Sequence, residues 1–211
     1  HRLVWNLQYP GFKSFPGILL WDMALEGPSA PPGRYQARLT AGGKTESRWF
    51  EIKPDPRLTD VSVADLRQRF DMALRIRDKT SVATAAVISI RALKQQVADR
   101  AKKADRGAVR TAAAALRATL SDIEGAIYEV DNRTVEDAKN HPLKLVNKLG
   151  YLQKVVESAE AKPTDQAQTV FDLLSAQLTE QLDRLARVSR TEVVKFNSLI
   201  RRNGLEPVQV E

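Results

Sequence analysis

The sequence predicts a mainly α protein of the α+β class, with an antiparallel β segment followed by an elongated antiparallel helical bundle. Two observations carry this prediction. Before residues 54–56 (Pro-Asp-Pro), short segments have the alternation and β propensity of strands, and all three tryptophans lie there: Trp5, Trp21 and Trp49. After this break, apolar residues recur at spacings of three and four, which is typical of amphipathic helices. We therefore predict two domains, residues 1–57 and residues 58–211.

Four segments of the first domain have strand-like sequences. Residues 3–7 and 18–21 are short apolar runs rich in residues that favour strands. Residues 34–40 alternate with period two, and residues 44–53 return after Gly42-Gly43. Two adjacent glycines supply the positive φ angles that a tight hairpin turn requires. The sequence thus predicts three or four antiparallel strands.

This number of strands is about half of an immunoglobulin-like β-sandwich, which usually has about seven strands in about 100 residues. We therefore expect residues 1–57 to form a partial immunoglobulin-like sandwich, with its remaining strands upstream of residue 1. Its inner face, carrying Trp5, Tyr35 and Leu39, needs a cover. Either the helices or a second copy of the chain, in a homodimer, would provide one.

The first predicted helix begins after the break, with Thr59 or Ser62 as its N-cap and Asp65 in its first turn. An apolar stripe continues from Leu66 to Val97 at spacings of three and four. At 1.5 Å per residue, a helix of about 40 residues is about 60 Å long. Because a compact small domain cannot bury such a rod, we expect an elongated bundle.

Two further helices are predicted from similar stripes. Apolar residues from Val109 to Val130 form the second, after a stop at Gly107. The last helix begins at the N-cap Thr164 and extends to about Arg202, where Asn203-Gly204 ends it.

The third helix is expected to begin at Pro142, with Asn140 or His141 as its cap, after an irregular polar segment. Four helices joined by short turns fit an up-and-down bundle. Alternatively, the second and third helices stack end to end as one broken arm of a three-helix bundle. The sequence leaves both arrangements open.

No motif in the sequence predicts catalysis or a bound cofactor. The chain has no cysteine and two histidines, His1 and His141, neither of which is spaced from other ligands as a metal site requires. Phosphate-binding glycine loops and nucleophile motifs are absent as well. We therefore name no catalytic, metal-binding or cofactor-binding residue, and expect no enzyme activity of this chain.

The net charge of +7 is concentrated on the first long helix. Residues 58–107 have 11 basic and 6 acidic side chains, whereas residues 108–211 have 14 and 15. The basic side chains form a candidate anion-binding surface: Arg67, Arg75, Arg77, Arg91 and Lys94. The simpler interpretation is a solvated helix face whose charges pair with neighbouring helices. Because no exposed aromatic residues accompany these cations, we do not expect nucleic-acid binding, and an adaptor for an anionic partner is a lesser alternative.

Several short segments of the sequence are distinctive. They lie at residues 5–11, 27–28, 30–35, 55–57, 70–78, 141–149 and 196–197. Together they resemble the C-terminal part of bacterial exported proteins with sortilin-like, neuraminidase-type (BNR) repeats, which are often labelled glycosyl hydrolases.

The resemblance implies a parent protein with one or two β-propellers upstream of an immunoglobulin-like segment and this helical tail. It also implies a periplasmic or extracellular location. The aspartate-box pattern of such propellers is absent from these residues, so no catalytic residue is carried over. The resulting hypothesis is a non-catalytic accessory module that packs, spaces or oligomerises the propeller protein. The alternative is a part of a glycoside hydrolase whose catalytic residues lie in the propeller.

Overall fold

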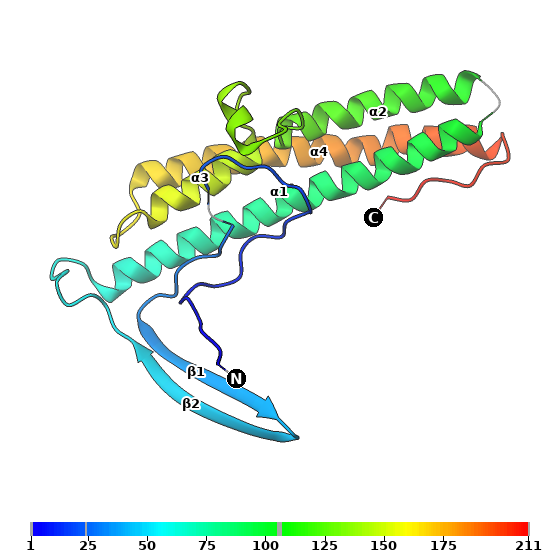
Figure 1. Cartoon of the computed structure of the whole chain (residues 1–211). Coiled ribbons are helices and arrows are strands. Elements are labelled where there is room, and N and C mark those ends of the chain that lie inside the picture. The colour runs from blue at the N-terminus through cyan, green and yellow to red at the C-terminus, as the bar shows by residue number, and fades with distance from the viewer. Residues whose placement is uncertain (1, 24, 105–106, 211) are drawn as a thin grey trace.

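The structure, a computed structural model, describes residues 2–23, 25–104 and 107–210. Within these residues the protein is mainly helical, with four α-helices, one short 3-10 helix and a two-stranded sheet (Figure 1). The elements in chain order are β1 (Gly33–Ala41), β2 (Lys44–Ile52), α1 (Val63–Lys103), α2 (Gly107–Ile127), η1 (Val135–Lys139), α3 (Leu145–Glu157) and α4 (Asp165–Arg201).

The helices form an elongated bundle with three arms. The helices α1 and α4 run its full length, and α2 and α3 follow one another along both of them (Figure 1). Of the two predicted arrangements, the bundle with one broken arm is therefore observed. None of the described helices is both long and apolar enough to cross a membrane.

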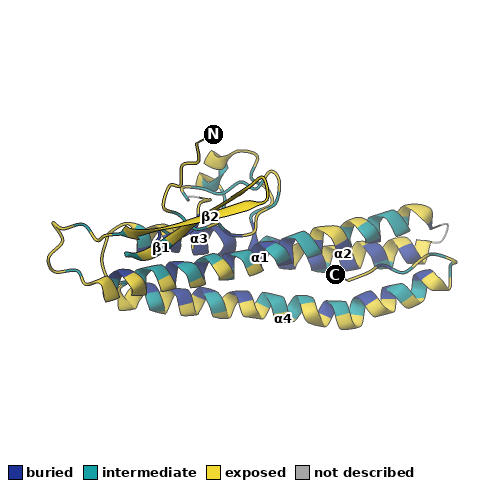
Figure 2. Ribbon diagram, turned by 90° about the horizontal axis from the view of Figure 1, so that it is seen from below, coloured by how far each residue is buried: buried dark blue, intermediate teal, exposed yellow. Residues whose placement is uncertain are grey.

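The core is a continuous apolar seam between the three arms (Figure 2). Isoleucine and leucine side chains from all four helices are fully buried in it, among them Ile76, Ile90, Ile123, Leu149, Leu178 and Ile200. The apolar residues whose spacing predicts the helices are the residues that are buried in this seam. Burying such side chains contributes about 1.5–3 kcal/mol each, so the seam dominates the stability of the bundle.

The predicted helix ends are confirmed at three places. Ser62 caps α1 and forms a capping box with Asp65. The Thr164 side chain accepts a hydrogen bond from the Ala167 amide at 3.1 Å and caps α4. Gly204 follows α4 with a φ of 70°, which favours glycine.

Two predicted helix ends and one stop are wrong. The third helix begins at Leu145 with Lys144 as its cap, so Pro142 is not its first residue and Asn140 and His141 do not cap it. The chain between α2 and α3 has to bridge the break in the arm, and apart from η1 it stays irregular until Leu145 reaches the core. Similarly, α2 ends at Ile127, because the exposed Val130 has no core to pack against. The predicted stop, Gly107, is the first residue of α2.

The strands predicted at residues 3–7 and 18–21 are not formed, so the sheet has two strands in the described part of the chain. Leu7 has a φ of 61°, which interrupts an extended strand, and Gln8 forms an isolated bridge with Ser29. The run at 18–21 is apolar for another reason, because Ile18 and Leu20 pack against the helical core.

The hairpin of β1 and β2 is formed as predicted. The strands pair antiparallel from Gly33 opposite Ile52 to Ala41 opposite Lys44. Gly42 and Gly43 have φ angles of 54° and 77°, which fit a two-residue turn. Unlike the helices, the hairpin is exposed over almost all of its length (Figure 2). It extends away from the bundle (Figure 1).

Candidate functional site

Residues 9–23 and 25–30, which we call the strap, connect the hairpin to the bundle without forming a helix or strand. The strap crosses α1, reaches α3 and returns to the hairpin (Figure 1). Its two ends meet at a neck, where the Tyr9 amide donates to the Pro28 carbonyl at 2.9 Å and the Gly27 amide donates to the Tyr9 carbonyl at 3.1 Å. A Cβ at Gly27 would collide with the Tyr9 and Pro10 carbonyl oxygens. The neck therefore requires glycine on steric grounds.

The backbone of the strap is bound by buried polar side chains of the helices. The Asn147 side chain on α3, only 6% exposed, accepts a hydrogen bond from the Trp21 amide at 2.8 Å and donates to the Trp21 carbonyl at 3.1 Å. A buried amide left without partners costs about 1–3 kcal/mol. The strap and α3 therefore depend on each other.

Three other side chains bind strap amides in the same way. The side-chain acceptors for strap amides are Ser81 for Lys13 at 3.0 Å, Tyr128 for Leu19 at 2.9 Å and Glu157 for Ser29 at 2.8 Å. These acceptors lie on α1, immediately after α2, and on α3. The strap is thus fastened to two arms of the bundle.

Apolar side chains of the strap fill the break between α2 and α3. Phe15, Ile18 and Leu20 pack against the helical core. The ring of Phe15 meets the ring of Tyr128 edge-on, with centroids 5.3 Å apart. The strap therefore completes the core where the third arm of the bundle is interrupted.

Two residues of the candidate anion-binding surface bind a carboxylate of the protein itself. Glu124 on α2 is only 3% exposed, and its oxygens lie 2.5 Å from Arg91 Nε and 2.9 Å from Lys94 Nζ. The guanidinium of Arg91 also lies 4.6 Å from the ring centroid of Phe15. Arg91 therefore joins α1, α2 and the strap.

Arg75 and Arg77 also have partners within the chain. Arg75 donates to the Gln168 side chain at 3.1 Å, and its guanidinium lies over the ring of Phe171 on α4 at 4.7 Å. Arg77 donates to the Pro10 carbonyl of the strap at 3.3 Å. These contacts link α1 to α4 and to the neck of the strap.

Arg67 lies beside Gly33 and Tyr35 at the base of the hairpin. The five cations span residues 67–94 of α1, about 40 Å of helix. Arg75 contacts α4 and Arg77 contacts the strap, whereas Arg91 and Lys94 share the carboxylate of Glu124. The structure does not bring them together in one pocket. An anion-binding surface made of these residues stays a prediction.

One face of the hairpin carries an aromatic cluster. Trp5 contacts Tyr35 and Phe50, with ring centroids 5.7 and 6.2 Å apart. The Tyr35 hydroxyl donates to the Pro31 carbonyl at 2.7 Å. Burial raises the pKa of this hydroxyl, and the neighbouring Tyr9 raises it further. Leu39, on the same face nearer the turn, is 68% exposed, so the cluster covers only the base of the hairpin.

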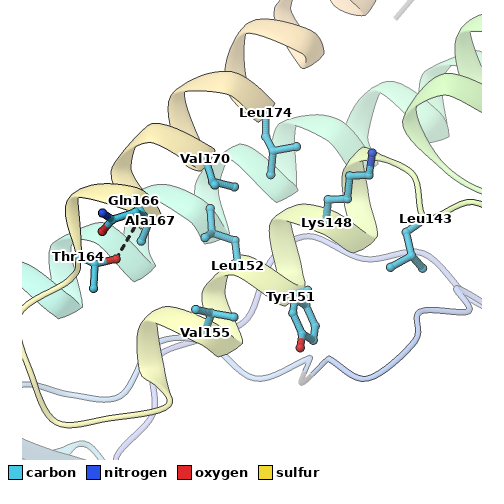
Figure 3. A pocket seen from close by; sticks show the side chains of 10 residues that line it. All are labelled: Leu143, Lys148, Tyr151, Leu152, Val155, Thr164, Gln166, Ala167, Val170 and Leu174. Atoms are coloured by element: carbon cyan, nitrogen blue, oxygen red, sulfur yellow. Dashed lines mark hydrogen bonds between the residues drawn. The ribbon is translucent and has the colours of Figure 1, made fainter.

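A shallow apolar groove of about 390 Å³ lies between α3 and α4 (Figure 3). Tyr151 and Val155 line its α3 side, and Val170 and Leu174 line its α4 side. Among the described residues that line it, Lys148 is the only charged one. The groove holds no convergent acids and bases, so its chemistry is suited to apolar contact.

Comparison with protein-family models, with curated proteins and with solved structures gives no match to the chain.

The strap is the structural element that the sequence prediction missed. A signal for it does exist on α3, where Asn147, Gly150 and Gln153 occupy positions that the structure shows to be buried. Because buried polar side chains are hydrogen-bonded, polar and small residues on a buried helix face indicate that polar groups, such as those of an extended backbone, pack against that face.

Proposed function

We propose that this chain is a non-catalytic scaffolding module, in which a rigid helical rod holds a β-hairpin in a fixed position for packing, spacing or oligomerisation. The observation that carries the proposal is the strap. It is fastened to the helices by side-chain hydrogen bonds to its backbone, and it ends at the base of the hairpin.

The base of the hairpin is held from three sides. Trp5, which precedes the strap, contacts Tyr35 and Phe50 in the hairpin. At the neck, Tyr9 contacts Phe70 on α1, with ring centroids 4.8 Å apart. On the other side, the connector after β2 is short and is ordered by Asp55, which accepts hydrogen bonds from the Arg57 amide and guanidinium. These contacts favour a fixed orientation over a flexible linker.

The resemblance to exported BNR-repeat proteins supplies the context of the proposal. In that context the module follows a β-propeller outside the cytoplasm, and the hairpin belongs to an immunoglobulin-like sandwich whose other strands come from upstream. The aromatic cluster of Trp5, Tyr35 and Phe50 suits the inner face of such a sandwich, because apolar side chains on the inner face of one sheet pack against the other sheet.

Distance measurements between spin labels test the proposal. Because the chain has no cysteine, the exposed pair Thr40→Cys on β1 and Thr191→Cys on α4 can be labelled selectively. The pair Thr111→Cys and Thr191→Cys, both on the bundle, is the matched control. We expect the hairpin-to-bundle distance distribution to be single and as narrow as that of the control. A distribution spread over tens of ångströms would make residues 1–57 a flexible appendage and would refute the scaffolding role.

A further inference from the structure

The outer edge of β2 is an unpaired row of backbone donors and acceptors. In the described part of the chain, β2 pairs with β1 alone, and all of its residues except Ile52 are exposed. The strand lies on the side of the hairpin away from the strap (Figure 1). Exposed strand edges of this length readily pair with another strand.

The two edges of the hairpin differ in charge. The strand β1 carries Arg34 and Arg38 and no acidic residue. By contrast, β2 carries both signs, with Glu46 and Arg48 two residues apart on the same face. Like charges placed opposite each other destabilise a sheet, whereas opposite charges stabilise it. Self-pairing is therefore disfavoured at the β1 edge and favoured at the β2 edge.

Hairpin geometry limits the registers that β2 can use. In a hairpin with a two-residue turn, the pair beside the turn, here Ala41 and Lys44, is a hydrogen-bonded pair, and the pairs alternate from there. The amides and carbonyls that point outward on β2 are therefore those of Thr45, Ser47, Trp49 and Glu51. A new strand has to meet these residues with its own outward-pointing groups.

Every antiparallel register centred on a residue of β2 satisfies this condition, and the registers centred near the middle of the strand pair the most residues. Centring the pair on Glu46 or on Arg48 places like charges opposite each other at the two-fold axis. Centring it on Ser47 places Glu46 of each copy opposite Arg48 of the other, twice. In this register these residues form non-hydrogen-bonded pairs, in which side chains are closest. Centring on Trp49 leaves both charges without opposite partners.

We propose that two copies of this chain associate through antiparallel pairing of their β2 edges, with the two-fold axis at Ser47, to form a four-stranded sheet. This inference rests on the proposed scaffolding function. It identifies the partner of the module as a second copy of the chain. Two-fold pairing is self-complementary, as a homodimer requires. The register also places Thr45 of each copy opposite Trp49 of the other, a pairing of β-branched and aromatic side chains that stabilises sheets.

Disulfide trapping tests the register directly. The Cα atoms of a hydrogen-bonded antiparallel pair are about 5.5 Å apart, which lies within the range for a disulfide. In the proposed dimer, Ser47→Cys should therefore cross-link to its copy under a glutathione redox buffer. The matched control is Thr45→Cys on the same strand. Its two copies are four residues apart along the axis, about 13 Å, and should remain largely uncross-linked.

Charge exchange tests the recognition. We expect Glu46→Arg or Arg48→Glu alone to weaken the dimer about tenfold, because each creates two like-charge pairs at the interface. The double variant Glu46→Arg with Arg48→Glu restores opposite charges and should return the dissociation constant to within about threefold of the original. Sedimentation velocity over a range of concentrations measures all four proteins.

The results separate this inference from the scaffolding role. Equal cross-linking of Ser47→Cys and Thr45→Cys, cross-linking of neither, or no rescue by the double variant would overturn the proposed dimer. None of these results bears on the spin-label distances, which can be measured in the Glu46→Arg variant so that distances between copies do not contribute. A broad hairpin-to-bundle distribution in that variant would instead refute the scaffolding function.

Discussion

The bundle and the hairpin both have periodic apolar patterns, but among the described residues only the pattern of the bundle is covered along its whole length. Ile90 on α1 is fully buried, whereas Leu39 on β1 is 68% exposed. Both residues lie on the apolar face that their periodicity predicts. The difference shows that periodicity identifies a face that needs a partner, while the chain's own length and topology decide whether the partner is present.

The largest expected effect contrasts these two residues. Ile90→Ala removes buried methyl groups and leaves a cavity in the seam, so we expect the free energy of unfolding to fall by about 2–5 kcal/mol. Leu39→Ala should change it by less than about 0.5 kcal/mol, because the side chain is already in water. Urea unfolding followed by circular dichroism measures both. Similar losses in the two variants would mean that the hairpin face is covered in solution.

A smaller effect is expected for the buried charge that joins α1 to α2. Glu124→Gln keeps the shape of the side chain but removes the charge between Arg91 and Lys94. We expect a loss of about 1.5–3 kcal/mol, the range for hydrogen bonds to charged groups. The control, Glu136→Gln, breaks an exposed pair with Lys139 and should cost less than about 0.5 kcal/mol. Thermal unfolding of the two variants distinguishes them, and an unaffected Glu124 variant would contradict a structural role for the Arg91 contacts.

The neck of the strap can be tested with two glycine substitutions. Gly27→Ala places a methyl group against backbone oxygens of Tyr9 and Pro10, which cannot move as a flexible side chain would. We expect a loss of about 1–3 kcal/mol. Gly125→Ala on α2 meets nothing within 4 Å and should instead stabilise the protein by about 0.5–1 kcal/mol, because alanine favours helix. If both variants were stabilised, the strap would not be held as the structure shows.

The smallest effect concerns the junction between the hairpin connector and α1. Hydrogen bonds from the Ser62 side chain and then from its amide hold the pKa of Asp65 below its usual value of 3.8. A lowered pKa in the folded state means that the stabilisation is present above pH 3.8 and is lost as the pH falls through the lowered pKa. Wild type should therefore be more stable than Asp65→Asn at pH 7, and the difference should shrink below about pH 4. Urea midpoints between pH 2 and pH 7 provide the check. Ser62→Ala, which removes one donor, should give a weaker pH dependence than wild type.

Much of the helical part could be predicted because its signals are local. The caps Ser62 and Thr164 and the stripe of α1 depend on residues within a few positions of one another. The hairpin was predictable for the same reason, since Gly42-Gly43 and the alternation of residues 34–40 lie side by side in the sequence.

The strap could not be predicted because its partners are distant in sequence. Asn147 binds Trp21 across more than a hundred residues. A short apolar run such as residues 18–21 fits the pattern of a strand and fits equally well the pattern of an extended segment that packs against helices. In the same way, the sequence places Arg91 on a basic helix but does not show that Glu124 lies against it. Long-range contacts thus account for both the missed strap and the partners of the basic residues.

Amide hydrogen exchange tests most directly whether the strap is a stable part of the bundle. The amides of Lys13, Leu19, Trp21 and Ser29 are hydrogen-bonded to side chains on α1, on α3 and directly after α2. We therefore expect them to exchange as slowly as core amides of α1, although they belong to no helix or strand. The outward amides of Ser47 and Trp49 in the wild-type monomer should exchange rapidly. Exchange of the strap amides at the rate of these hairpin amides would contradict the account, because the hairpin would then have no fixed attachment to the helices.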